Sequence, residues 1–249
     1  MRPLTVVFPF FCNPGMLAEQ AAVWRAYPDD LLAQLHIIVV DDCSPDGERA
    51  AAVDVPGLGS LRIFRLLEKK RWNWLACRNL GARVATTDWL LLTDIDHVVP
   101  AETVRRLVDG DLDARSAYRF RRVTATGAWP YDVAALPDYK PHNDSWLLTR
   151  SLFFDERVGG YDERLSGCYG TSGEFRDRVL AAAWSHVLLP EVLVRYPREV
   201  IADASTLPSV YTRKNDPEND AELARRKAKR DRVHNWRPVH GLVPWEQVA

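Results

Sequence analysis

Short apolar runs separated by helix-like segments constrain the fold of this chain more than any other feature. They include Leu4–Phe8, Leu35–Val40 and Asp88–Thr93, and apolar residues at helical spacing mark Met16–Tyr27 and Asn73–Ala85 between them. Strands that are apolar throughout are buried on both faces, and intervening helices permit parallel connections. The sequence therefore predicts an α/β fold with a Rossmann-like, mostly parallel central sheet flanked by helices.

The second half of the chain is less regular. Thr124–Pro141 is rich in Pro, Gly and Tyr, which predicts a long loop of the kind that often carries function. Other expected elements are strands at Leu61–Leu66, Ser116–Val123, Ser145–Arg150, His186–Leu189 and Val192–Tyr196 and a helix at Glu174–Trp184.

We expect one domain over residues 1–205, with a donor half at about 1–100 and an acceptor half at about 101–205. A basic extension follows at 206–249. Asp216 and Pro217 form a helix start, and Leu223–Arg232 is strongly basic. The basic segment suggests contact with nucleic-acid phosphates or an anionic surface, and the alternative is a solvated helical face.

Composition excludes several classes of protein. The chain has 249 residues, 33 Lys+Arg against 34 Asp+Glu, and 47% hydrophobic residues. These values exclude a disordered chain, a collagen-like repeat, a coiled coil and a globally basic nucleic-acid binder. No apolar run approaches the roughly 18–20 residues of a membrane helix. The four cysteines form no C-x-x-C pair, so we expect free thiols and a cytoplasmic protein.

Acidic residues follow two of the predicted strands directly. Asp41 and Asp42 end the strand at 35–40, where open α/β sheets bind ligands, and could accept hydrogen bonds from a ribose or a base. The alternative is a turn capped by its own aspartates. Asp94, Asp96 and His97 follow the strand at 88–93. Two such carboxylates repel each other unless a cation neutralises them, which indicates Mg²⁺ or Mn²⁺. His97 is either a further ligand or a neutral histidine nearby.

Two further segments carry charged residues that could belong to the site. Lys69, Lys70, Arg71 and Arg78 could bind a diphosphate, although a solvated face is the alternative for the two lysines. Glycines between 159 and 173 imply a tight loop, after which a helix begins with Glu174 and Asp177. Either acid could be a general base, or both could simply stabilise the helix dipole.

Five motifs in this order resemble the family 2 glycosyltransferases of the GT-A fold, over roughly residues 4–197. The motifs are TVVFPFF, VVDDCSPDG, NWLACRNLGA, LLLTDIDHVV and GGYDERLSG with the glycines and Glu174 that follow. The resemblance implies a nucleotide-diphospho-sugar donor, with UDP favoured, a divalent Mn²⁺ or Mg²⁺, and inversion at the anomeric carbon. The helical C-terminal appendage lies outside it.

The resemblance also implies roles for individual residues. Asp96 would be the more direct metal ligand and Asp94 would lie closer to the ribose. The residues implied to contact the donor are Pro9 and Phe10 near the base, Asp42 with Asp41 at the uridine, Arg78 and Asn79 beneath the donor, and Gly160, Tyr161 and Asp162 around the donor and acceptor pocket.

The chain departs from the family pattern at two positions. Phe175 stands where the family places the acid most often assigned as base, so Glu174 or Asp177 must replace it or activity is lost. Arg195 stands where a late strand often ends in a metal-binding histidine. His142, His97 or water could take that place.

The motifs do not specify the class of acceptor. Aromatic and imidazole rings in or beside the long loop could stack on sugars or on bases, namely Trp129, Tyr131, Tyr139, His142 and Trp146. Together with the basic tail they keep open, beside a glycan or small-molecule acceptor, transfer to hydroxymethylated bases in DNA.

Other classes fit the motifs less well. A haloacid-dehalogenase-like phosphatase would need Thr where Val98 stands, and a dehydrogenase would need a G-x-G-x-x-G after a strand. A nucleotide-diphosphate hydrolase or nucleotidyltransferase would be recognised by its products. The alternative outside enzymes is a sugar-nucleotide-binding protein that has lost catalysis, as Phe175 suggests.

Overall fold

A mixed β-sheet forms the centre of the molecule. The computed structural model describes residues 2–53, 55, 60–70, 72–125, 130, 132–196, 217–231 and 237–249. The strands are β1 (Leu4–Phe10), β2 (Leu35–Asp41), β3 (Leu61–Leu66), β4 (Trp89–Leu92), β5 (His97–Val98), β6 (Ala117–Thr124), β7 (Asp138–Tyr139), β8 (Trp146–Thr149), β9 (His186–Arg195) and β10 (Trp245–Gln247). Their order is β10-β3-β2-β1-β4-β8-β6-β9-β5, and β7 pairs with β6.

The first half of the sheet is parallel, as predicted. β1 pairs in parallel with β2 and β4, and β2 pairs in parallel with β3. From β8 onward the sheet is mixed, because β8 runs antiparallel to both β4 and β6. The carboxyl ends of β1, β2 and β4 therefore meet at one edge of the sheet. The start of β8 lies at the same edge, next to the end of β4. This arrangement is the α/β fold with a central sheet flanked by helices that the sequence predicted.

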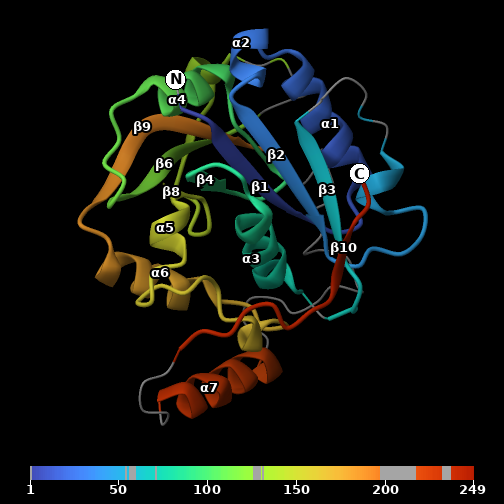
Figure 1. Cartoon of the computed structure of the whole chain (residues 1–249), viewed down its shortest axis with the longest axis vertical. Helices are drawn as coiled ribbons and strands as arrows, with labels where there is room; N and C mark the ends of the chain where they lie inside the picture. The colour runs from blue at the N-terminus through green and yellow to red at the C-terminus, as the bar shows by residue number, and fades with distance from the viewer. Residues whose placement is uncertain are drawn as a thin grey trace.

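Helices cover both faces of the sheet (Figure 1). Buried side chains of α1 (Pro14–Arg25), α2 (Asp29–Leu32) and α4 (Ala101–Asp109) belong to one hydrophobic core. Those of α3 (Trp74–Val84), α5 (Arg150–Phe153) and α6 (Ser172–Ala182) belong to the core on the opposite face. Three short 3₁₀ turns, η1 (Ala50–Ala52), η2 (Val133–Ala135) and η3 (Glu163–Leu165), lie in the connections.

A glycine brings α3 close to the sheet. A Cβ on Gly81 would lie 2.2 Å from a methyl carbon of Val7 in β1, so the helix could not pack at this distance with any side chain there. This close packing fixes the position of Arg78 and Asn79, which precede Gly81 by three and two residues in α3 and are both buried.

The two strands predicted at 186–189 and 192–196 form one strand, β9. Its register against β6 passes from Phe120–Leu189 directly to Arg121–Val192, which leaves Pro190 and Glu191 out of the ladder. Proline lacks the amide proton that the ladder needs, so a bulge there allows the strand to continue.

The C-terminal part of the chain packs against the preceding domain. Helix α7 (Pro217–Asp231) includes most of the predicted basic segment, and Arg226 donates hydrogen bonds to the backbone oxygens of Arg164 and Ser166. β10 pairs antiparallel with β3, at the edge of the sheet. Figure 1 shows α7 beyond the helices that cover one face, away from the sheet. Within the described ranges, no helix is both long and apolar enough to cross a membrane.

Candidate active site

The acids after β2 have different roles. Asp41 accepts backbone hydrogen bonds from Ser44 at 2.7 Å and Ala50 at 2.8 Å, so it holds the turn together. Asp42 accepts one from the backbone of Asn73 at 2.8 Å through Oδ2, while its buried Oδ1 has no hydrogen-bond partner. Burial raises the pKa of Asp42 well above its usual range. Asp42 is therefore the acid with an oxygen left for a ligand.

Backbone strain gathers around Asp42. Cys12, Cys43 and Trp72 have φ values of 46°, 55° and 45°, in the left-handed region that non-glycine residues rarely adopt. They flank the end of β1, Asp42 itself and the start of α3. Strained conformations persist where the surrounding structure holds them, and they gather at ligand sites. Their positions support the prediction of a ligand site at this edge of the sheet.

Arg78, which is fully buried, forms an ion pair with the partly exposed Asp94. The Arg78 guanidinium bonds to Oδ1 of Asp94, to the backbone oxygen of Asp144 and, at 3.0 Å, to the hydroxyl of Tyr161. Its Cζ also lies 4.7 Å from the ring centroid of Trp74. Burial favours the neutral form of Asp94, but Arg78 and His142 outweigh it and lower the pKa of that carboxyl. The role of Arg78 in the described structure is to fix Asp94.

Asp96 is held by His97. Nδ1 of His97 lies 2.7 Å from Oδ1 of Asp96, and Nε2 of His97 lies 3.1 Å from Nη1 of Arg122. Because a guanidinium only donates, Nε2 accepts and the proton of His97 sits on Nδ1, facing Asp96. Burial opposes ionisation of Asp96, but His97 lowers its pKa below the usual range. Both nitrogens of His97 are thus engaged without a metal.

A loop brings His142 to the same carboxylates. Nε2 of His142 lies 3.3 Å from Oδ2 of Asp94, and its ring stacks on His97 with centroids 4.5 Å apart. Arg119 donates to the His142 backbone oxygen at 2.7 Å, and Arg122 donates to that of Lys140 at 2.9 Å. Two arginines of β6 therefore hold the loop in place.

One aspartate and two histidines of this cluster offer a set of metal ligands. Ligand atoms of Asp94, His97 and His142 lie within 4.8 Å of one another. Burial lowers the pKa of His142 to about 3, so its ring is neutral near pH 7, as a metal ligand must be. A carboxylate beside a neutral imidazole suits Mn²⁺ better than Mg²⁺, which prefers oxygen alone.

The segment after Gly159 packs against Asn79 of α3. Gly160 has φ +70°, and a Cβ there would lie 2.8 Å from Oδ1 of Asn79. Asn79 also accepts from the Tyr161 amide and donates to Oε1 of Glu163. Asp162 is buried against Arg164 at 2.8 Å. In the described structure, Asn79, Gly160 and Asp162 shape the wall of the site, and their contact with a donor stays a prediction.

Glu163 ties this wall to the C-terminal segment. Its two carboxylate oxygens accept hydrogen bonds from the amides of Gly241 at 2.7 Å and Leu242 at 2.8 Å. Its own amide donates to the backbone oxygen of Val239 at 2.8 Å. The sequence showed Glu163 only as part of a family motif, and gave no signal that residues near 240 would bind it.

The two predicted bases lie in different surroundings. Glu174 is buried, and Arg178 binds both of its oxygens at 2.7 and 2.6 Å. Asp177 is 68% exposed and paired with Arg176. Phe175, in the place of the family's second acid, stacks on Tyr161 with centroids 3.8 Å apart. The described contacts of Glu174 leave neither oxygen unpaired for an acceptor hydroxyl.

Asp144 is an acid that the sequence reasoning missed. The β4–β8 register pairs Leu92 with Trp146, which brings the residues just before β8 opposite Asp94. Oδ1 of Asp144 is buried without a hydrogen-bond partner, and burial raises the pKa of this carboxyl to about 6. An acid directly before an apolar strand was a signal in the sequence, but only antiparallel pairing places it beside Asp94.

Other predicted residues lie at the margin of the site or outside the described structure. Pro9 is partly buried at the end of β1, and the Phe10 side chain is in the core on the α1 face. Trp146 is fully buried and Tyr139 is 46% exposed. Arg71, Trp129 and Tyr131 fall outside the described residues.

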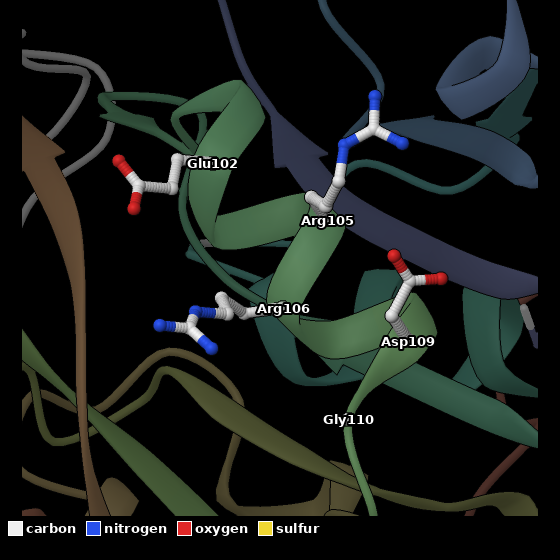
Figure 2. Close-up of a pocket in the computed structure, with 5 residues that line it drawn as sticks. All are labelled: Glu102, Arg105, Arg106, Asp109 and Gly110. Carbon is white, nitrogen blue, oxygen red and sulfur yellow. The ribbon is translucent and has the colours of Figure 1, made fainter.

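A separate hollow lies on α4. Its lining is Glu102, Arg105, Arg106, Asp109 and Gly110 (Figure 2). It contains none of the predicted site residues, and Arg105 is already paired with Asp30 at 2.6 Å. The carboxylate cluster, not this hollow, is the candidate active site.

Comparison with known proteins identifies the family. The model for glycosyl transferase family 2 matches residues 19–146, just over half of the chain. The chain belongs to glycosyl transferase family 2. The matched range contains the acids after β2 and β4 and the Arg-Asn pair of α3, as the sequence resemblance predicted.

Solved structures agree on the fold. S. aureus TarS 1–349 in complex with UDP-GlcNAc matches with a TM-score of 0.65 and 15% identity, over 91% of this chain and 66% of that one. A mannosyltransferase from Pyrobaculum calidifontis in complex with GDP-Man and Mn²⁺ matches with a TM-score of 0.55 and 17% identity, over 78% and 57%. The chain thus spans less than two thirds of either structure. No match was found among curated proteins.

Proposed function

We propose that this chain transfers a sugar from a nucleotide-diphospho-sugar, with UDP-sugars favoured, to an acceptor hydroxyl with inversion. The observation that carries the proposal is the convergence of Asp42, Asp94 and Asp96 at one edge of the sheet, where a neighbouring residue holds each carboxylate by a hydrogen bond. The unpartnered Oδ1 of Asp42 suits the N3–H of a uracil or a ribose hydroxyl. The similar structures bind UDP-GlcNAc and GDP-Man, so UDP and GDP donors are the two candidates for this chain.

A divalent cation, Mn²⁺ before Mg²⁺, would be held by Asp94, Asp96 and His142. The donor set fits, because Oδ2 of Asp94 and Nε2 of His142 lie 3.3 Å apart and belong, with His97, to one cluster of ligand atoms. Asp96 is included on the family resemblance, and its Oδ1 is bound to His97. Ligation by His97, predicted from the sequence, would require it to release Asp96 or Arg122. When bound, the cation would neutralise charge that develops on the departing diphosphate.

The acceptor step needs a carboxylate with a free oxygen. We assign it to Asp144 on geometry, because its Oδ1 is unpartnered while Arg178 binds both oxygens of Glu174. The acceptor oxygen attacks the anomeric carbon and its proton passes to Asp144. The bond from the anomeric carbon to the β-phosphate oxygen breaks, and its electron pair leaves with the diphosphate. Glu174 and Asp177 are the competing assignments.

Charge pairing within the basic segment bears on the class of acceptor. In the described part of the basic segment, Arg225 and Arg226 both bind Glu222 at 2.6–2.7 Å, so part of its charge is neutralised within the helix. A glycan or small molecule is therefore the first acceptor to test. Transfer to hydroxymethylated DNA bases is the second, through salt-sensitive DNA binding.

A thermal-shift screen tests the donor and the cation together. UDP-glucose, UDP-GlcNAc, GDP-mannose, UDP and GDP are each added with Mn²⁺, with Mg²⁺ or with EDTA. A ligand that binds the native state raises the midpoint by an amount set by its concentration relative to Kd. We expect a UDP-sugar to stabilise most with Mn²⁺, and Asp42→Ala to remove that effect. If wild-type protein binds no nucleotide under any condition, the proposed function is wrong.

A further inference from the structure

Arg195 ends β9 beside the candidate metal site. The antiparallel register pairs it with His97 of β5, and the amide of the next residue, Tyr196, donates to the Asp96 backbone oxygen at 2.9 Å. Its Nε lies 3.9 Å from Oδ2 of Asp96, and its side chain is 18% exposed. The backbone thus holds a guanidinium at the edge of the carboxylate cluster, with one side still open to a ligand.

The donors of Arg195 are not used within the described structure. A guanidinium has five N–H donors, and a separation of 3.9 Å is too long for a hydrogen bond. Among the described residues, the Arg195 side chain makes no hydrogen bond. Arg78, by contrast, bonds to Asp94, Tyr161 and Asp144. Arg78 is committed to the framework, while Arg195 can still bind a ligand.

A second guanidinium lies next to Arg195. The Cζ atoms of Arg122 and Arg195 lie 4.6 and 5.7 Å from the ring centroid of Tyr139. Burial and then the charge of Arg195 lower the pKa of Arg122. Arg78 is paired with Asp94 and Arg195 lies near Asp96, while Arg122 contacts His97 between these two acids and the loop. Like charges held this close favour an anion between them, and planar guanidinium forks match phosphate oxygens.

We propose that Arg195 binds the diphosphate of the nucleotide donor and keeps hold of it as the leaving group. The proposal rests on the proposed function. Arg195 and His142 then divide two tasks, since His142 offers a metal ligand from the loop and Arg195 supplies a fixed positive charge from β9. A permanent cation aimed at the phosphate stabilises the charge that develops there during transfer.

Calorimetric titration of UDP and ligand-observed NMR of uridine test the proposal, each with Mn²⁺ and with EDTA. The variants are Arg195→Ala and Arg195→Lys, and the control is Arg121→Ala, whose side chain is 47% exposed and pairs with exposed Asp138. We expect Arg195→Ala to weaken UDP binding about 10- to 100-fold, the range for a lost charge-assisted hydrogen bond. Uridine has no phosphate for Arg195 to bind, so its affinity should be the same in the Arg195 variants as in wild-type protein.

The outcomes separate the inference from the function. Arg195→Lys should recover part of the UDP affinity through its charge, and it serves as the test variant if Arg195→Ala does not fold. Unchanged UDP affinity in the Arg195 variants, or equal loss for UDP and uridine, overturns the proposal while leaving nucleotide binding intact. Wild-type protein that binds neither UDP nor GDP overturns the proposed function and this inference together.

Discussion

The guanidinium of Arg122 lies 3.1 Å from Nε2 of His97, and this contact decides how Asp96 is held. Because Nε2 must accept, Nδ1 carries the proton that His97 donates to Asp96. The same arginine donates to the Lys140 backbone oxygen, at the start of the loop that brings His142 to Asp94. One buried side chain therefore joins the D-x-D motif to the histidine loop.

Replacing Arg122 should destabilise the protein. Arg122→Ala leaves the Lys140 oxygen and Nε2 of His97 without their donor, which should lower the free energy of unfolding by about 1–3 kcal/mol. Urea unfolding measures this change. Arg121→Ala, one residue away and exposed, should change it by less than about 0.5 kcal/mol. Equal changes in the free energy of unfolding for the two variants would contradict the role of Arg122 in holding His97 and the loop at Lys140.

His142→Ala should weaken Mn²⁺ binding. Loss of the imidazole removes one ligand next to Asp94, so we expect a fall in affinity of about tenfold or more. Electron paramagnetic resonance of free Mn²⁺ measures the affinity directly. His36→Ala is the matched control, because His36 lies in β2, outside the ligand set, and bonds only weakly to Thr86 at 3.5 Å. Unchanged Mn²⁺ affinity in His142→Ala would remove His142 from the site.

Asp144→Asn and Glu174→Gln distinguish the two assignments of the base. If Asp144 takes the proton, Asp144→Asn should lower kcat by about 10²–10⁴ while UDP binding is kept. Glu174→Gln should mainly lower stability, because it breaks the bidentate pair with Arg178. Full loss of transfer in a stable Glu174→Gln protein, with an active Asp144→Asn, would return the role to Glu174.

Asp42 should make stability depend on pH. Its pKa is raised in the folded state, so above its unfolded value of about 3.9 the native protein keeps a proton that the unfolded chain releases. The stability gained from this group is complete below that pH and is lost as pH rises toward the folded pKa. Asp42→Asn should remove the loss, with a slope difference of at most about 1.4 kcal/mol per pH unit. Parallel pH profiles of the two proteins between pH 4 and 7 would contradict the shift.

Glu163→Ala should loosen the attachment of the C-terminal segment. The amides of Gly241 and Leu242 and the side chain of Asn79 would lose a charged acceptor. We expect a loss of about 2–4 kcal/mol in the free energy of unfolding, and faster amide exchange in residues 237–249. Glu156→Ala, which changes an exposed acid in the preceding loop, is the control. Normal exchange protection of residues 237–249 in Glu163→Ala would show that another contact holds the segment.

The sequence by itself determined the parallel half of the fold and the motifs on it. Apolar runs at β1, β2 and β4 can only be buried on both faces, and their periodicity is local, so it can be read without knowing any contact. The same reasoning placed Asp42, Asp94 and Asp96 at one sheet edge. It could not separate Asp41 from Asp42, because that depends on which oxygens the turn after β2 uses.

The tertiary structure decided what lies opposite those motifs. Asp144 and His142 reach Asp94 because β8 pairs antiparallel with β4, and Gly241 reaches Glu163 although the two residues are 78 positions apart in the sequence. Arg195 reaches Asp96 only through the β5–β9 register. Pairing between distant segments depends on the packing of the whole core and leaves no local period in the sequence. Asp42, Asp94 and Asp96 were therefore predictable, while Asp144 and the contacts that hold these carboxylates were not.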